Sequence, residues 1–300
     1  MSIEKRRQAS HKQPHEQRIK TCLPMLLVVC VLTHAAGCAS GTPQRSNIAS
    51  DRGSGANPGT DAWSNAIKTR DLEALEVMLD TNIDPDLPGV GGKTALMIAA
   101  QAGDLPLVTS LLEAGADANA RNQHLGTPLM FAATGGSKPV SQTLILNGAE
   151  VDAVARLGWT PLLLAAAKGN TDVALLLIDA GANPDRADGY GWTPLMRAVT
   201  GRHLATAQAL LATGLLNLDA SEESGASALH IAAGEGQTGM VAALLDAGAN
   251  PSATDAAGRT PATVAELAGF ADLAAILSAA SGTADRPGVS PAVDSVHGAD

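Results

Sequence analysis

A short motif recurs through most of this chain at an almost constant interval, and this repetition constrains the fold more than any other feature. The motif Thr-Pro-Leu, or a near match, starts at six positions spaced 33, 33, 33, 34 and 33 residues apart. These positions are Thr94, Thr127, Thr160, Thr193, Ser227 and Thr260. Glycines follow the same interval at Gly115, Gly148, Gly181, Gly214 and Gly248. Such a period predicts stacked supersecondary units, none of which can bury its apolar face alone.

The residues of one period indicate what each unit contains. Threonine caps helix N-termini and proline suits a first helical turn, so each Thr-Pro predicts a helix start. A second helix with leucines at helical spacing follows, and the glycine falls where a left-handed residue ends it. We therefore expect helix, turn, helix and loop in each unit, with the one extra residue in the loop between Gly214 and Asp219.

Composition agrees with a helical stack of small residues. Only 2% of residues are aromatic, whereas 45% are hydrophobic. The first value excludes an aromatic-filled core, and the second excludes disorder throughout the chain.

The segment GWTPLLLAAAKGNTDVALLLIDAGANPD, residues 158 to 185, resembles an ankyrin repeat almost throughout. The resemblance covers residues 61–281, with five clear repeats from 92 to 257. Residues 61–91 and 258–281 resemble the N-terminal and C-terminal caps of that family. The resemblance implies an all-α ankyrin solenoid of about seven repeats, caps included.

The N-terminus has the order of a secretory signal peptide. Residues 1–22 carry six Lys/Arg, Leu23 to Leu32 is apolar, and small residues follow up to Cys38. We expect residues 1–37 to be a signal peptide, because ten apolar residues are too few to span a bilayer. Ala-Ala-Gly-Cys resembles the bacterial lipobox, which implies lipidation of Cys38; ordinary cleavage after Ala35 is the alternative. Residues 38–60 are then a lipidated cysteine and flexible linker, and 282–300 a disordered tail.

Charge and cysteine usage bear on location and partners. After residue 22 the chain holds fourteen Lys/Arg and twenty-eight Asp/Glu, a net charge of −14, which disfavours nucleic acid and anionic lipid as partners. No cysteine follows Cys38, so no disulfide framework is possible there. We expect an exported, periplasmic, monomeric protein that meets the membrane only through its lipid. The resemblance to bacterial lipoproteins also implies the outer rather than the inner membrane, because Ala39 and not Asp follows the cysteine.

Motifs for catalysis, metals and cofactors are weak. Gly89 to Thr94 superficially resembles a phosphate-binding loop, yet Leu87 stands where the first glycine is required and Thr94 is in register with the repeat motif. The histidines after the expected signal peptide lie in different repeats or in the tail, and His230 is expected to bond loop backbone. We expect no enzyme activity, no metal and no cofactor.

The scarce aromatics indicate a binding surface. Ankyrin loops project as β-turn fingers, and partners of that family usually bind along these fingers and the adjacent helix ends. Tryptophan and arginine dominate interface hot spots. The expected partner-binding residues, for an unidentified protein, are Arg156, Leu157, Trp159, Lys168, Arg186, Tyr190, Trp192, Glu223 and Glu235. The alternative for the tryptophans is packing against the neighbouring finger. The alternative function is an enzyme or small-ligand carrier that uses the concave groove.

Overall fold

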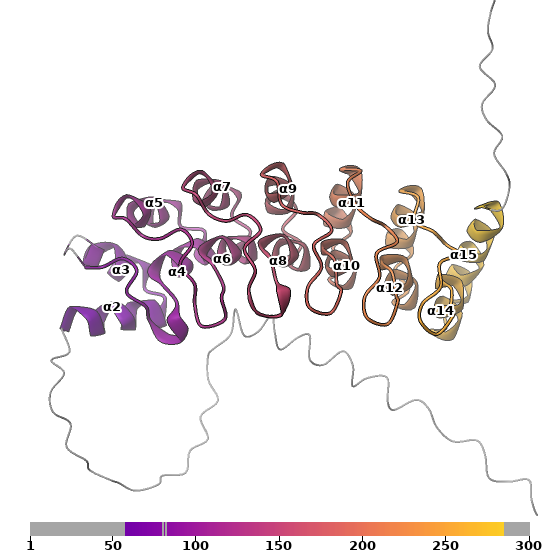
Figure 1. Cartoon of the computed structure of the whole chain (residues 1–300), viewed down its shortest axis with the longest axis horizontal. Helices are drawn as coiled ribbons and strands as arrows, with labels where there is room; N and C mark the ends of the chain where they lie inside the picture. Colours follow the sequence, from indigo (N-terminus) through magenta and orange to yellow (C-terminus); the bar gives the residue numbers. More distant parts are fainter. Residues whose placement is uncertain (1–57, 80, 82, 285–300) are drawn as a thin grey trace, which may run out of the picture. The chain divides into compact units, whose positions relative to one another are not determined.

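The computed structural model describes residues 58–79, 81 and 83–284 (Figure 1). The expected signal peptide and Cys38 lie outside these residues. The first described helix, α2, begins at Pro58, inside the expected linker 38–60, and the last, α15, continues to Ala284, three residues into the expected tail.

The described residues form seven consecutive helix pairs. The first helices of the pairs are α2 (Pro58–Thr69), α4 (Ala95–Ala102), α6 (Pro128–Gly135), α8 (Pro161–Lys168), α10 (Pro194–Thr200), α12 (Ala228–Gly234) and α14 (Pro261–Leu267). The second helices are α3 (Leu72–Leu79), α5 (Leu105–Glu113), α7 (Lys138–Leu146), α9 (Thr171–Asp179), α11 (Leu204–Ala212), α13 (Thr238–Asp246) and α15 (Ala271–Ala284). Apart from one isolated bridge, Ser221 to Ser227, no β-pairing occurs in the described residues. The predicted all-α solenoid is confirmed.

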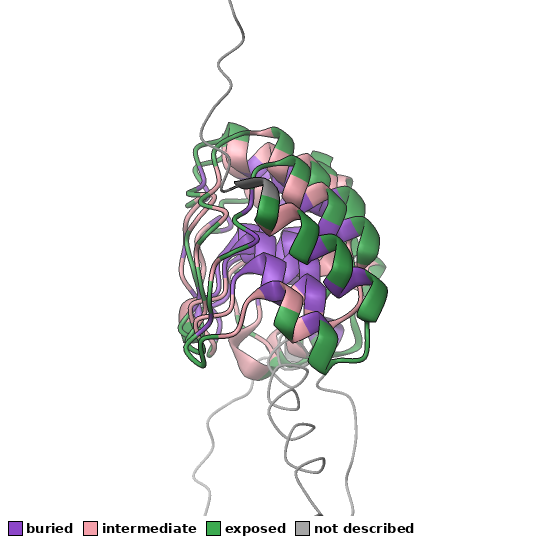
Figure 2. Cartoon of the chain, turned by 90° about the vertical axis from the view of Figure 1, so that its right-hand side faces the viewer, coloured by how far each residue is buried: buried purple, intermediate pink, exposed green. Residues whose placement is uncertain are grey.

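The pairs stack into two layers (Figure 1). From α4 onward, each first helix packs against the first helix of the next pair, and from α3 to α13 each second helix packs against the next second helix. The end-on view shows buried residues concentrated between the layers, with the connecting loops on one side (Figure 2). Each repeat thus contacts only its neighbours, as in other one-dimensional stacks.

Local capping explains where the first helices begin. The hydroxyl oxygens of Thr94, Thr160, Thr193 and Thr260 each accept a hydrogen bond from a backbone N–H three residues later, at 3.2–3.4 Å. Proline then occupies the first turn in α6, α8, α10 and α14. The glycine series ends the second helices with positive φ, from 67° at Gly214 to 94° at Gly115. The extra residue lies between α11 and α12, as expected.

Alanine pairs let the first helices approach closely. Ala99–Ala100, Ala132–Ala133, Ala165–Ala166 and Ala232–Ala233 are all 0% exposed. A larger side chain there would separate helices that pack on both sides. The second helices bury one face only, as with Val173, Ala174 and Leu177 in α9. Because small alanines let the first helices pack closely on both sides, the chain builds a core with few aromatic residues.

Carboxylates and amides join successive repeats on the side of the second helices. The carboxylate of Asp152 accepts a hydrogen bond from the backbone N–H of Asn183, and Asp185 accepts one from Asn217. Asn119 accepts from Glu150 at 2.7 Å, and Asp219 from Asn250 at 3.4 Å. These contacts repeat once per unit, so they set the register of neighbouring repeats.

Candidate protein-binding surface

Six tight loops, each five residues long, precede the first helices from α4 to α14, and we call them fingers 1 to 6. They comprise residues 89–93, 122–126, 155–159, 188–192, 222–226 and 255–259. In each finger the backbone N–H of the first residue donates to the carbonyl of the fifth, at 2.8–3.1 Å. This bond closes the loop and leaves its three central residues at the tip.

A backbone ladder connects the fingers. The N–H of the second residue of each finger donates to the carbonyl of the third residue in the preceding finger. The bonds run from Gln123 to Gly91, Arg156 to His124, Gly189 to Leu157, Glu223 to Tyr190 and Ala256 to Ser224, at 2.7–3.3 Å. Successive tips are therefore held side by side along the stack.

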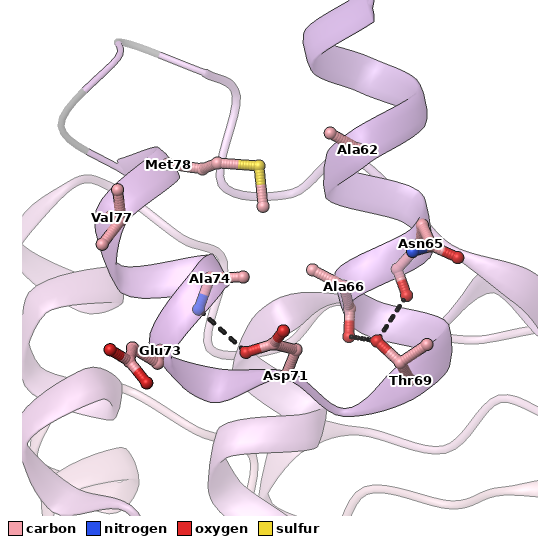
Figure 3. Close-up of a pocket in the computed structure, with 9 residues that line it drawn as sticks. All are labelled: Ala62, Asn65, Ala66, Thr69, Asp71, Glu73, Ala74, Val77 and Met78. Atoms are coloured by element: carbon pink, nitrogen blue, oxygen red, sulfur yellow. Dashed lines mark hydrogen bonds between the residues drawn. The ribbon is translucent and has the colours of Figure 1, made fainter.

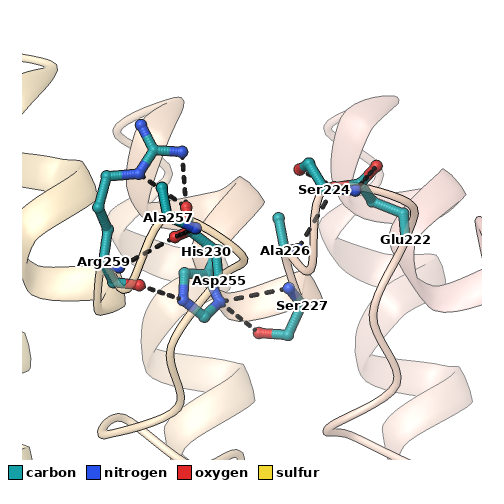
Figure 4. Close-up of polar contacts among 8 residues, drawn as sticks. All are labelled: Glu222, Ser224, Ala226, Ser227, His230, Asp255, Ala257 and Arg259. Carbon is teal, nitrogen blue, oxygen red and sulfur yellow. Dashed lines mark hydrogen bonds and ion pairs between the residues drawn. The ribbon is translucent and has the colours of Figure 1, made fainter.

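In four fingers the first residue also caps the tip with its side chain. One Oδ1 atom of Asn122, Asp188 or Asp255 accepts two backbone N–H bonds from its own finger, at 2.8–3.1 Å. Glu222 does the same with its two carboxylate oxygens in finger 5, where its contacts with Ser224 and Ala226 are drawn in Figure 4. Ala155 in finger 3 and Gly89 in finger 1 lack this cap.

An arginine that sequence reasoning missed holds fingers 3 and 4 together. The Arg197 guanidinium lies 4.5 Å from the Trp159 ring centroid and 5.0 Å from that of Trp192. Its Nη2 pairs with the Asp188 carboxylate, and both side chains are buried. Burial lowers the pKa of Arg197 to about 10, so the group remains a cation at neutral pH. A cation between two aromatic faces and beside a carboxylate forms a rigid clamp.

The clamp shows how much of each tryptophan is accessible at the fingers. Trp159 is only 3% exposed, and Trp192 is partly buried. The packing alternative therefore describes Trp159, whose ring is covered by a residue of the next repeat. A similar contact joins finger 1 to the next repeat. Lys93, like Trp159, is the last residue of its finger, and its Nζ lies 5.8 Å from the ring centroid of Phe131 in α6.

Apolar side chains are exposed at the tips of the first four fingers. Val90, Leu125, Leu157 and Tyr190 are 62, 46, 44 and 41% exposed. We call these four residues the tip row. Leu125 and Leu157 also hold left-handed backbone, with φ of 62° and 59°. Leucine rarely adopts this conformation, which costs about 1–2 kcal/mol relative to a right-handed one.

The remaining expected site residues lie on the fingers or at first-helix ends. Arg156 is exposed at the tip of finger 3, Arg186 is exposed two residues before finger 4, and Glu223 is exposed on finger 5. Lys168 is half-buried at the end of α8. Glu235, half-buried after α12, accepts a 2.8 Å hydrogen bond from Gln237 and lies 3.7 Å from Arg202.

Comparison with known proteins identifies the repeat family. Models described as ankyrin repeats match residues 46–122, 63–155 and 129–216, and a further ankyrin model matches 210–265. The chain belongs to the ankyrin-repeat family. The ankyrin-repeat domain of Bcl-3 is 28% identical over 73% of this chain and 98% of its own, with a TM-score of 0.61. The human ASB11 ankyrin-repeat domain shares the fold at 23% identity, over 74% of this chain and 98% of its own, with a TM-score of 0.64. Curated protein sequences gave no match.

Ankyrin repeats generally bind other proteins.

His230, which was expected to bond loop backbone, does so here. His230 Nδ1 accepts from the Ser227 backbone N–H at 3.2 Å and lies 2.9 Å from the Ser227 hydroxyl (Figure 4). Its Nε2 lies 3.0 Å from the carbonyl oxygen of Arg259, which can only accept. Nδ1 thus caps the start of α12, and Nε2 joins α12 to finger 6.

A shallow hollow lies in the N-terminal repeat, between α2 and α3 (Figure 3). Its polar groups serve local helix ends: Asp71 Oδ1 accepts from the Ala74 N–H at 3.0 Å, and the Thr69 hydroxyl donates to the Asn65 carbonyl at 2.9 Å. Glu73, Val77, Met78 and three alanines line the rest. This lining holds no nucleophile paired with a base.

Two further searches cover the described residues. No helix in residues 58–79, 81 and 83–284 is long and apolar enough to cross a bilayer. Within the same ranges, no three His, Cys, Asp or Glu side chains gather as metal ligands would.

One signal in the sequence was sufficient to find the clamp. Arg197 is the fourth residue of α10, and the matching residues of the other first helices after α2 are Ile98, Phe131, Leu164, Ile231 and Val264. A single cation at an otherwise apolar place in a repeat requires a buried partner. The tryptophans and Asp188 are the residues that supply it.

Proposed function

We propose that this ankyrin-repeat protein is a non-catalytic binding module of the bacterial cell envelope. It docks onto another protein along its fingers and supports or inhibits that protein. The family supports recognition as the general role. The feature that carries the proposal here is the tip row. Its four apolar side chains are exposed, and two of them, Leu125 and Leu157, also stand on left-handed backbone, with no evident use inside the fold.

The envelope location rests on the N-terminal sequence alone. Leu23 to Leu32 and Cys38 support export and lipid anchoring, with residues 39–57 as the tether between the lipid and the repeats. In this arrangement the anchor places the repeats in the periplasm, beside the outer membrane. A partner would then be periplasmic or exposed to the periplasm.

A pull-down from a purified envelope fraction tests the binding role. The full chain should retain one or a few proteins that a variant with Leu157→Asp no longer retains. Leu146→Asp is the matched control, because Leu146 is 79% exposed on α7 and lies away from the fingers. Equal retention by all three proteins, or no retention by any, would contradict the proposal.

A further inference from the structure

Two of the exposed apolar tip residues, Leu125 and Leu157, stand where glycine would fit more easily. At the fourth place of the fingers, Gly92, Gly158, Gly191, Gly225 and Gly258 all have positive φ, and Leu125 adopts the same conformation in finger 2. Leu157 holds it at the third place of finger 3. Both side chains are nearly half exposed, so the strain is not compensated by burial within the chain. A contact outside the chain would compensate it.

In fingers 2 to 4 and the two residues before each of them, the exposed charged side chains are positive, although the chain as a whole is acidic. Residues 120–126, 153–159 and 186–192 contain three exposed charged side chains, and all are arginines: Arg121, Arg156 and Arg186. Their one acidic side chain, Asp188, is buried against Arg197. Arg121 already pairs with Glu150 at 2.9 Å, which leaves Arg156 and Arg186 as the cations closest in sequence to the exposed tips. In finger 5 the sign reverses at Glu223.

The spacing of the tips restricts the shape of what they can contact. Leu157 and Tyr190 occupy the same place in consecutive repeats, and stacked helices lie about 10 Å apart. A polyproline II chain rises about 3.1 Å per residue with three residues per turn, so its side chains return to one face about every 9.3 Å. A polyproline II chain that lies along the fingers therefore presents every third side chain to successive fingers.

We propose that Leu125, Leu157 and Tyr190, with Arg156 and Arg186, form a docking row for an extended acidic segment of the partner, with an apolar side chain at every third residue. This inference rests on the proposed binding role. The backbone ladder and the Arg197 clamp keep the tips in fixed register, which lowers the entropy lost on binding. Glu223 repels such a segment beyond finger 4 and so fixes where it ends.

Synthetic peptides test the proposal without knowledge of the partner. Fluorescein-labelled ten-residue peptides carry leucine at every third position and Asp or Glu between, and fluorescence anisotropy reports binding to the full chain. Matched peptides place the same leucines at every second or every fourth position, and another replaces the acids with lysine. We expect the period-three acidic peptide to bind at least tenfold more tightly than each of these, and to weaken as salt rises.

Variants then locate the site. Leu157→Gly removes the side chain at a place where glycine is favoured, so the fold is retained, and Arg156→Glu combined with Arg186→Glu reverses the charge. Each should weaken the period-three peptide at least tenfold. Leu146→Ala on α7 and Lys138→Glu at the start of α7 are the matched apolar and charge controls, and neither should change its affinity.

The outcomes separate this inference from the proposed function. If no peptide binds, or if spacing makes no difference, the docking row is wrong, while loss of envelope partners with Leu157→Asp would still support the binding role. If the chain forms dimers that Leu157→Gly dissociates, the row belongs to a second copy and the proposal is overturned. Peptide binding that survives both site variants would likewise overturn it.

Discussion

At the scale of single residues, Arg197 stabilises the candidate surface more than Trp159 and Trp192, the residues that the sequence singled out. Its guanidinium contacts Trp159 from finger 3 and Trp192 from finger 4, and pairs with the carboxylate that caps finger 4. A buried ion pair is costly to break from one side, because the remaining charge stays in a place without water. The position of the exposed Tyr190 thus depends on a buried group.

We expect Arg197→Leu to lower the free energy of unfolding by about 3 kcal/mol, because it leaves Asp188 buried without its cation. The double variant with Asp188→Asn should recover most of this loss. An asparagine already caps finger 2, as Asn122, and a leucine already occupies the matching place in α8, as Leu164. Urea denaturation of the two single variants and the double variant measures the coupling. Additive losses would contradict the clamp.

A second residue-scale prediction concerns acid. Burial acts to raise the pKa of Asp255, but hydrogen bonds from Arg259 and Ala257 outweigh it and hold the pKa below its ordinary value of 3.8. A lowered folded-state pKa adds stability above about pH 4 that disappears as pH falls through the folded value.

Asp255→Asn should therefore cost about 1 kcal/mol at pH 7 and progressively less below pH 4. Thermal melts across pH 2.5–7 measure the gap between the variant and the natural chain. Asp246→Asn, on an exposed carboxylate at the end of α13, is the control and should show no such gap. A gap for Asp255→Asn that is constant with pH would contradict the role of its charge.

At the scale of elements, helices and fingers differ in how far sequence could predict them. Helix starts and ends were predictable because a threonine cap or a terminal glycine acts within a few residues of itself. Burial of Trp159 was not predictable from finger 3, since the residue that covers it, Arg197, belongs to the next repeat. The hydrogen-bond ladder between fingers was not predictable either, because it joins backbone groups and requires no particular side chain.

We expect Leu157→Gly to raise stability slightly, by about 0.5 kcal/mol. Relief of the left-handed leucine contributes about 1–2 kcal/mol, and the greater entropy of glycine in the unfolded chain takes back about 0.4–1 kcal/mol. Chemical denaturation measures the difference. A clear loss of stability would show that the Leu157 side chain supports finger 3 itself.

The second helices should be sensitive to cavities on their buried face. Leu177 is 0% exposed in the central α9. Leu177→Ala should cost about 2–5 kcal/mol, since the stack has neighbours on both sides that restrict collapse around the hole. Leu146→Ala, on the exposed end of α7, is the matched control and should cost less than about 0.5 kcal/mol. Denaturation midpoints of the two variants provide the comparison.

At the scale of the whole molecule, the proposed function joins a repeat domain to an N-terminal anchor. In that proposal the repeats bind a partner through the fingers, and residues 39–57 connect the repeats to the expected lipid at Cys38. The period of 33 residues was sufficient to predict the repeat architecture, since each unit repeats the same caps and the same apolar positions. Which finger side chains are exposed could be read only from the structure, because their burial depends on contacts with the next repeat.

Lipidation of Cys38, as proposed, leads to a further prediction. The mature protein should label with palmitate and partition into detergent, and Cys38→Ser should abolish both, because acyl chains alone would hold it at the membrane. Expression in a bacterial host followed by detergent phase separation measures this. Labelling that persists in Cys38→Ser would contradict lipidation at that cysteine, and cleavage after Ala35 would then be the better explanation.

The placement of the three tryptophans has a spectroscopic consequence. Trp63 lies in the first repeat, and Trp159 and Trp192 share the Arg197 clamp at the centre of the stack. The protein has no tryptophan beyond Trp192, so α12 to α15 carry no indole chromophore. Fraying of those helices would thus reduce ellipticity while leaving indole emission unchanged. Disagreement between the two optical signals during denaturation would locate the first repeats to melt.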